Sequence, residues 1–431
     1  MQAAPERPRS SRRVLAQLSA MMFLQSWTLG TWAMTIGTFI TANTGEAGRG
    51  TFSAGFAGYS AAAGAVGGLI APVLVGAISD RRLSAQYVLA IMNLGCAAAS
   101  YGMFVCTSQT TFFLCLLGFF HCFVPAASLN NSISFRHLKN PESEFPILRV
   151  CAALGWITAG LFVGLAWPGM TGESIEDTPM PFAIGAVSCL STALFCLTLP
   201  QTAPAANSGQ ASLRDALAAV GKGNRPLVVF LTISFLIAVP TMAYNNFANA
   251  FLNWEDYPNP AALLTLGQVS ELTLLALTPW FVSRLGLPAL FLVGAVSWGL
   301  RYFCFAATSL FGTDSTAILA ILLHGPCFAW VFVTGPMYID RIVQPELRGS
   351  IHGLYYSVMF GFANLAGAAV VGALQERLLT PEGVSPAPYD WTTFWSAFGG
   401  ISLAAAALAF LLLKPSLRGE AEAPQRTLED S

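Results

Sequence analysis

Long apolar runs, each of about 20 residues, follow one another through almost the whole chain, and that is the length of helix needed to cross a bilayer. A backbone in lipid must satisfy its hydrogen bonds internally, so such runs fold as helices. The chain is 55% hydrophobic and 10% charged, whereas a soluble domain carries about 25% charge. The sequence therefore predicts an all-α membrane protein with twelve transmembrane helices, at positions 14–41, 53–79, 86–107, 111–134, 148–168, 181–200, 226–252, 261–284, 287–308, 315–341, 349–374 and 391–413.

One long polar segment divides these runs six and six. Residues 201–225 are rich in Ala, Ser, Gly and Pro, which is typical of a linker. We therefore expect an N-terminal half over 1–200, a linker over 201–225, a C-terminal half over 226–414 and a tail over 415–431. Two pseudo-symmetric six-helix halves with a binding site at their interface is a transporter architecture.

Basic residues in the loops predict the orientation. They gather on the side that holds the two ends of the chain and the linker, while the other side carries only Arg49 and Arg377. The positive-inside rule places both termini in the cytoplasm. The opposite loops are acidic, with Glu173, Glu176, Asp177, Glu255, Asp256 and Asp314.

Motifs of other protein classes are missing from the sequence. The nine cysteines show no metal-binding spacing, and we find no HExxH, GxSxG or phosphate-binding loop. The formal net charge of -1 gives no sign of a nucleic-acid partner. We therefore expect that the protein is not an enzyme and that it binds no cofactor and no metal.

An acid lies in the middle of the run LTLGQVSELTLLALTPW. A carboxylate at that depth costs at least about 2.5 kcal/mol, so Glu271 should face a water- or substrate-filled interior. Gln268 lies one turn earlier on the same helix face. A structural acid paired with a neighbouring helix is the alternative interpretation.

Two more ionisable residues lie near the middle of apolar runs, Arg301 and His324. A lone guanidinium in a membrane needs an acceptor. If Glu271 is that acceptor, it stays ionised; if not, burial favours its protonated form, which suits a proton carrier. The sequence leaves both possibilities open, and His324 is a second candidate for proton coupling.

Several stretches resemble the nucleoside:proton symporter family of the major facilitator superfamily. They are LQSWTLGTWAMTIGTFI (24–40), GAISDRRLSAQYVLAI (76–91), RVCAALGW (149–156), QVSELTLLALTPWFVSRLG (268–286), SWGLRYFCFA (297–306) and DWTTFW (390–395). The Gly76–Arg82 turn also resembles the GxxxDR signature of the superfamily. The resemblance implies a substrate site between the halves, with Arg149, Asn245, Gln268 and Glu271 matching in type. Three positions depart from the family pattern: His324 stands where a Tyr is familiar, Ala329 where a carboxylate is expected, and Met242 where a Gln is expected.

A nucleoside needs aromatic faces for its base and amide or carboxylate groups for its polar edges. We expect the substrate-binding residues to be Gln25, Trp27, Arg149, Asn245, Gln268, Glu271, His324 and Phe328, with Trp32, Tyr244 and Trp330 as further aromatic candidates. For proton coupling we expect Glu271, His324 and Arg301. For gating we expect two turns, with Gly76, Asp80, Arg81 and Arg82 in the first and Asp340 and Arg341 in the second, and charge pairs between their Asp and Arg side chains. Pro240 and Pro336 should kink their helices.

These observations predict a monomeric carrier in the bacterial inner membrane that imports nucleosides by alternating access, coupled to protons. The alternatives are a uniporter or symporter of another small polar solute, such as a sugar or a nucleobase, or a receptor descended from a transporter.

Overall fold

The computed structural model describes residues 10–45, 50–67, 69, 83–202, 224–344, 347–378 and 390–419. Within these ranges the chain is helical apart from its loops and one isolated bridge between Thr44 and Phe52. The helices in chain order are α1 (Arg12–Ala33), α2 (Ile36–Ala42), α3 (Phe56–Ser60), α5 (Ala85–Val105), α6 (Gln109–His137), α7 (Pro141–Leu161), η1 (Phe162–Ala166), α8 (Trp167–Thr171), α9 (Met180–Cys196), α11 (Arg225–Ala238), α12 (Thr241–Trp254), α13 (Pro260–Leu285), α14 (Leu287–Phe311), α15 (Asp314–Leu322), α16 (His324–Ile342), α17 (Arg348–Tyr356), η3 (Ser357–Phe362), α18 (Ala363–Leu378) and α19 (Trp391–Gly419). The segments η1 and η3 are π-helical.

The predicted apolar runs are mostly helical where the structure describes them. In the described part of the chain, nine helical segments are long and apolar enough to cross a membrane, and Met180–Cys196 is a shorter apolar helix. The helix α1 is not among the nine, because polar residues such as Gln17, Gln25 and Thr28 lower its mean hydropathy. Residues 68 and 70–79 of the second predicted run, 53–79, lie outside the described ranges, so twelve spans in two halves of six remain a prediction.

Two long helical segments are interrupted midway. The interruption between α11 and α12 lies at Pro240, as predicted, because proline cannot donate a backbone hydrogen bond. The interruption between α15 and α16 lies at Leu323, whereas the helix runs on through Pro336. At this second break, the carbonyl of Leu322 accepts a hydrogen bond from the Ser270 hydroxyl of α13 (2.7 Å).

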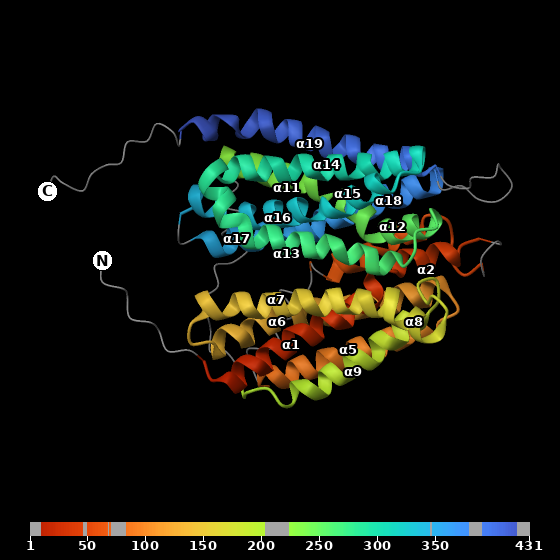
Figure 1. Cartoon of the computed structure of the whole chain (residues 1–431). Helices are drawn as coiled ribbons and strands as arrows, with labels where there is room; N and C mark the ends of the chain where they lie inside the picture. Colours follow the sequence, from red (N-terminus) through yellow and green to blue (C-terminus); the bar gives the residue numbers. More distant parts are fainter. Residues whose placement is uncertain are drawn as a thin grey trace.

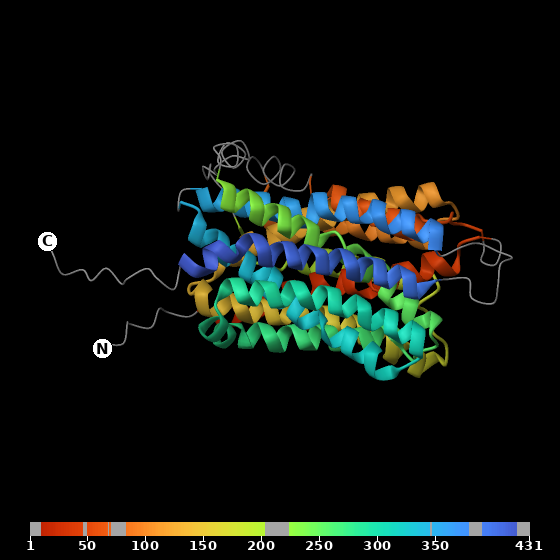
Figure 2. The same cartoon turned by 90° about the horizontal axis from the view of Figure 1, so that it is seen from above.

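The long helices form two bundles and run along one common axis (Figure 1 and Figure 2). The first bundle contains α1, α5, α6, α7 and α9, and the second contains α11 to α19. Each has an aromatic core, around Trp32 and Phe182 in the first and around Trp298, Tyr302 and Trp395 in the second. We call the end where α1 begins and α19 ends the proximal end, and the other the distal end.

Close backbone contacts join the bundles at the distal end, where α2 packs on α12 and α3 packs on α18 (Figure 1). A Cβ atom added to Gly37 would overlap the carbonyl of Asn246, and one added to Gly58 would overlap the backbone of Gly372. The hydroxyl of Thr38 donates a hydrogen bond to Asn249 Oδ1. Opening the distal end therefore requires these surfaces to separate.

Candidate functional site

A buried arginine is the centre of a polar cluster inside the second bundle. Arg301 of α14 is 0% exposed. Its Nη2 donates a hydrogen bond to Nδ1 of His324, the first residue of α16, over 3.0 Å. Because a guanidinium can only donate, Nδ1 accepts and carries no hydrogen. The contact therefore selects the neutral tautomer of His324 with its hydrogen on Nε2.

That hydrogen points toward Glu271. Nε2 of His324 lies 3.3 Å from Oε2 of Glu271 on α13. The His324 side chain is 6% exposed and the Glu271 side chain 34% exposed. The three residues thus form a chain that runs from a fully enclosed cation, through a neutral imidazole, to a carboxylate that solvent reaches.

An aromatic ring completes the surroundings of the cation. The guanidinium carbon of Arg301 lies 3.1 Å from the ring centroid of Tyr244 on α12, and 5.6 Å from that of Trp298. A guanidinium over an aromatic face is stabilised by the ring quadrupole, by about 2 kcal/mol or more when desolvated. The arrangement answers the question that the sequence left open: Arg301 and Glu271 are linked through His324 rather than paired directly.

Groups suited to a flat polar ligand lie next to this chain. The Phe328 ring stacks on the His324 ring, with centroids 4.2 Å apart and planes 19° apart. Gln268, one turn before Glu271, is half-buried, and its Oε1 has no hydrogen-bond partner among the residues that the structure describes. Asn245 follows Tyr244 and is exposed, although the rest of α12 from Thr241 to Leu252 is buried. The helix thus turns one amide toward open space.

Comparison with known proteins identifies the family. A family model described as "Nucleoside H+ symporter" matches residues 13–418. The chain belongs to the nucleoside H+ symporter family. It is therefore a multi-pass membrane transporter of a non-enzymatic family, as the sequence predicted.

Relatives match along nearly their whole length. The chain is 31% identical over 411 residues to the putative nucleoside transporter YegT of Escherichia coli K12, covering 93% of both chains. It is 28% identical to the nucleoside permease NupG of the same strain, over 92% of this chain and 95% of NupG. It is 25% identical to the xanthosine permease of that strain, over 93% and 96%.

Solved structures match as well. The crystal structure of the nucleoside transporter NupG superposes with a TM-score of 0.82 at 25% identity, covering 93% of this chain and 99% of NupG. Peptide transporters of the POT family match at 12–14% identity, a similarity that shows a shared fold only.

Within this symporter, three predicted residues lie apart from the Glu271 cluster. Gln25 is buried in the first bundle, where its Oε1 accepts a hydrogen bond from Asn93 (3.2 Å). Trp27 donates its Nε1 hydrogen to Ser188 of α9 (3.2 Å), and so points into its own bundle. Arg149 of α7 is exposed and lies near the hydroxyl of Tyr356 in the other bundle. Arg149 therefore faces the interface, whereas Trp27 does not.

Two residues near His324 on α16 also turn away. Trp330 packs against Phe281, with ring centroids 4.9 Å apart. Ala329 is buried beside it, 1% exposed, in the same apolar cluster with Leu290. The position at which the family pattern has a carboxylate is therefore enclosed by apolar side chains here. Trp32, the remaining aromatic candidate, lies in the core of the first bundle.

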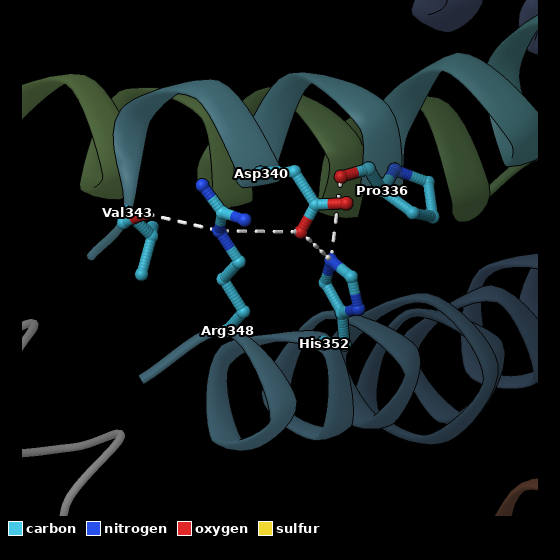
Figure 3. Close-up of polar contacts among 5 residues, drawn as sticks. All are labelled: Pro336, Asp340, Val343, Arg348 and His352. Atoms are coloured by element: carbon cyan, nitrogen blue, oxygen red, sulfur yellow. Dashed lines mark hydrogen bonds and ion pairs between the residues drawn. The ribbon is translucent and has the colours of Figure 1, made fainter. Parts of the chain in front are cut away.

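The predicted gating residues are described only in part, since Gly76, Asp80, Arg81 and Arg82 lie outside the described residues. Asp340 contacts two side chains of α17, Arg348 (Nε to Oδ1, 3.8 Å) and His352 (Nε2 to Oδ1, 3.1 Å), as Figure 3 shows. Arg341 is exposed. Asp340 thus joins two helices within the second bundle at its proximal end.

Sequence reasoning missed one polar site, at the distal end. Glu176 was grouped with the surface acids of the outer loops, yet it is 2% exposed. Its partners Asn249 and Asn253 lie one turn apart on α12. Two asparagines at this spacing on an apolar helix were the available signal.

Proposed function

We propose that this chain imports nucleosides together with protons by alternating access, that the substrate binds between the bundles, and that Glu271 is the proton carrier. The observation that carries the proposal is the chain Arg301–His324–Glu271, which ends in a partly exposed carboxylate inside a membrane-spanning helix. An ionisable group at this depth marks an ion or substrate pathway.

The chemistry of coupling follows from the hydrogen-bonding roles. An ionised Glu271 can only accept, and it accepts from His324 Nε2. A proton on Glu271 adds a donor, which can bind an acceptor of the nucleoside, such as a ribose oxygen. Substrate binding and proton binding therefore favour each other at this one carboxyl group.

The charge of the cluster gives the proton its driving force. With Glu271 ionised, Arg301 and Glu271 sum to zero, and with Glu271 protonated the cluster carries one positive charge. A charge that crosses the whole membrane potential gains about 2.3 kcal/mol per 100 mV. A potential that is negative inside would thus favour inward movement of the loaded carrier.

The remaining features of the proposal come from the sequence and the relatives. The proximal end is cytoplasmic, following the positive-inside rule, and the carrier works as a monomer of two six-helix halves in the bacterial inner membrane. Gln268 and Asn245 bind polar edges of the substrate, and Phe328 stacks on its base. Nucleosides are the substrate class because the names of YegT, NupG and the xanthosine permease specify nucleoside transport.

The test is uptake of labelled uridine, adenosine and xanthosine into proteoliposomes, with and without an inward proton gradient. Wild type should accumulate at least one nucleoside only with the gradient. Glu271→Gln should still exchange nucleoside across the membrane but should not concentrate it. Glu173→Gln, at an exposed loop acid, is the matched control and should behave as wild type. Gradient-driven accumulation by Glu271→Gln would remove Glu271 from the coupling.

A further inference from the structure

A second acid is enclosed between the bundles, far along the chain from Glu271. Glu176 belongs to the loop between α8 and α9 of the first bundle and is 2% exposed. It lies at the distal end, between the membrane-spanning segments rather than inside one. A carboxylate is rarely buried to this degree unless it has polar partners.

The contacts of Glu176 reach across to the second bundle. Its Oε2 accepts hydrogen bonds from Nδ2 of Asn249 (2.8 Å) and Nδ2 of Asn253 (3.0 Å) on α12. Its Oε1 accepts from the backbone N–H of Ala261 (3.1 Å), in the first turn of α13. Asn259, which precedes α13, makes no side-chain capping bond, so Glu176 serves as the cap from the other bundle. All three donors separate from Glu176 if the distal end opens.

These helices also carry the proposed substrate groups. Asn245 lies on α12, and Gln268 and Glu271 lie on α13. The protonation state of Glu176 therefore affects the position of α12 and α13, the helices that carry these groups.

The surroundings of Glu176 contain no cation among the contacts that the structure describes. Its donors are two neutral amides and one backbone N–H, and the hydroxyl of Thr38 on α2 is bonded to Asn249 beside them. The charged neighbour is Asp177 of its own loop, which is also negative. A buried carboxylate without a counter-charge is stabilised by taking up a proton.

We propose that Glu176 is a second proton-binding residue of this carrier, which meets the distal solution when the distal end is open and is enclosed with a proton when that end closes. The inference rests on the proposed alternating-access function and on the distal end being extracellular. It adds a step to that function: a low extracellular pH promotes closure of the distal end, and so favours the state in which the site opens to the cytoplasm.

Linkage gives the direction of the effect. Burial raises the pKa of Glu176 in the closed state, and the hydrogen bonds from Asn253, Asn249 and Ala261 only partly oppose this. In the open state the carboxyl is in water and has its ordinary pKa. The closed state consequently binds the proton more tightly. The proton-linked stabilisation of the closed state is fully present below the ordinary pKa and is lost as the pH rises through the raised value.

The site can accommodate both protonation states. A half-turn of the Asn249 side-chain amide would present Oδ1 to Glu176, so that it accepts the hydrogen of a protonated acid, while its Nδ2 donates to the hydroxyl of Thr38. Asn253 would keep its bonds to Glu176 and to the backbone carbonyl of Asn249. Glutamine can use the same exchange, which makes Glu176→Gln a mimic of the protonated acid with little change of shape.

The experiment measures hydrogen–deuterium exchange of wild type and Glu176→Gln in lipid nanodiscs between neutral pH and about pH 5, with each rate corrected for the intrinsic rate at that pH. The reporters are peptides that contain the amide of Ala261 and the end of α12, and peptides of α5 are the internal reference. Glu173→Gln, at an exposed acid of the same loop, is the matched control.

In wild type and in Glu173→Gln, protection of the distal amides should rise severalfold on acidification, because each unit of pKa shift corresponds to a tenfold change. In Glu176→Gln, protection should be high at all pH values and independent of pH. A flat wild-type profile, an unchanged pH dependence in Glu176→Gln, or a parallel change in α5 would each overturn the proposal. No nucleoside is present, so the result is separate from the uptake test of Glu271.

Discussion

Replacing His324 separates two roles that a histidine beside a carboxylate can have. The structure assigns His324 the role of a neutral bridge, because Nδ1 accepts from Arg301 and Nε2 faces Glu271. Glutamine also offers one acceptor and one donor but cannot bind a proton at neutral pH. Phenylalanine keeps the stacking on Phe328 and removes both polar contacts.

The magnitudes differ between the two variants. A hydrogen bond to a charged group contributes about 1.5–3 kcal/mol, so His324→Phe loses about 3–6 kcal/mol from its two contacts. Part of this loss comes from Arg301, which is 0% exposed and would be left as a buried cation. His324→Gln should lose about 1 kcal/mol or less, since both contacts can re-form.

The assay combines thermal stability of the purified protein with nucleoside accumulation in proteoliposomes. We expect His324→Phe to unfold at a distinctly lower temperature and to lose accumulation. We expect His324→Gln to retain gradient-driven accumulation, at a rate within about tenfold of wild type. Arg301→Lys is a useful companion variant, because lysine keeps the charge but lacks the planar guanidinium that lies over Tyr244.

One result would refute the reasoning. If His324→Gln is as stable as wild type and exchanges nucleoside but no longer accumulates it, then His324 itself takes up the coupling proton. The neutral-bridge assignment would then be wrong, and Glu271 would be the acceptor that orients a titrating imidazole.

Two further predictions concern the binding site and the distal contact. Gln268→Ala should raise KM for nucleoside about tenfold with little change in Vmax, because the substrate can donate a hydrogen bond to the unpaired Oε1 of Gln268. Initial uptake rates over a range of nucleoside concentrations measure KM and Vmax. An unchanged KM would place Gln268 outside the site. Gly37→Ala should lower Vmax at least tenfold, because the new methyl group would overlap the Asn246 carbonyl and hold the bundles apart. Gly169→Ala, where an added Cβ meets nothing within 4 Å, is its control, and equal uptake by the two variants would contradict the distal closure.

Much of the fold could be read from the sequence because the bilayer imposes simple rules. Runs of about 20 apolar residues must be helices, and the described helices lie where those runs predicted them. The break at Pro240 also followed from local chemistry. The break at Leu323 was not predicted, although Pro326 lies three residues further on and has no N–H to donate to the carbonyl of Leu322. That carbonyl accepts from Ser270 on another helix instead.

The members of the polar cluster could be listed from the sequence, but their partners could not. Glu271, Arg301 and His324 stood out because ionisable residues are costly in a membrane. Which of them touch depends on the rotation and register of three helices, and hydropathy does not encode this. On a helix such as α13, both lipid-facing and protein-facing residues are apolar, so no clear polar face indicates its orientation.

The sequence by itself determined that this chain is a helical membrane carrier of the nucleoside H+ symporter family, with an acid, an imidazole and a guanidinium inside its spans. Only the tertiary structure decided that His324 stands between Arg301 and Glu271, and that Glu176, a loop acid by its position in the chain, is buried between the bundles. The physical reason is the same in both cases. Membrane insertion depends on the average polarity of a segment, whereas a polar contact depends on which side chains two packed helices bring within about 3 Å of each other.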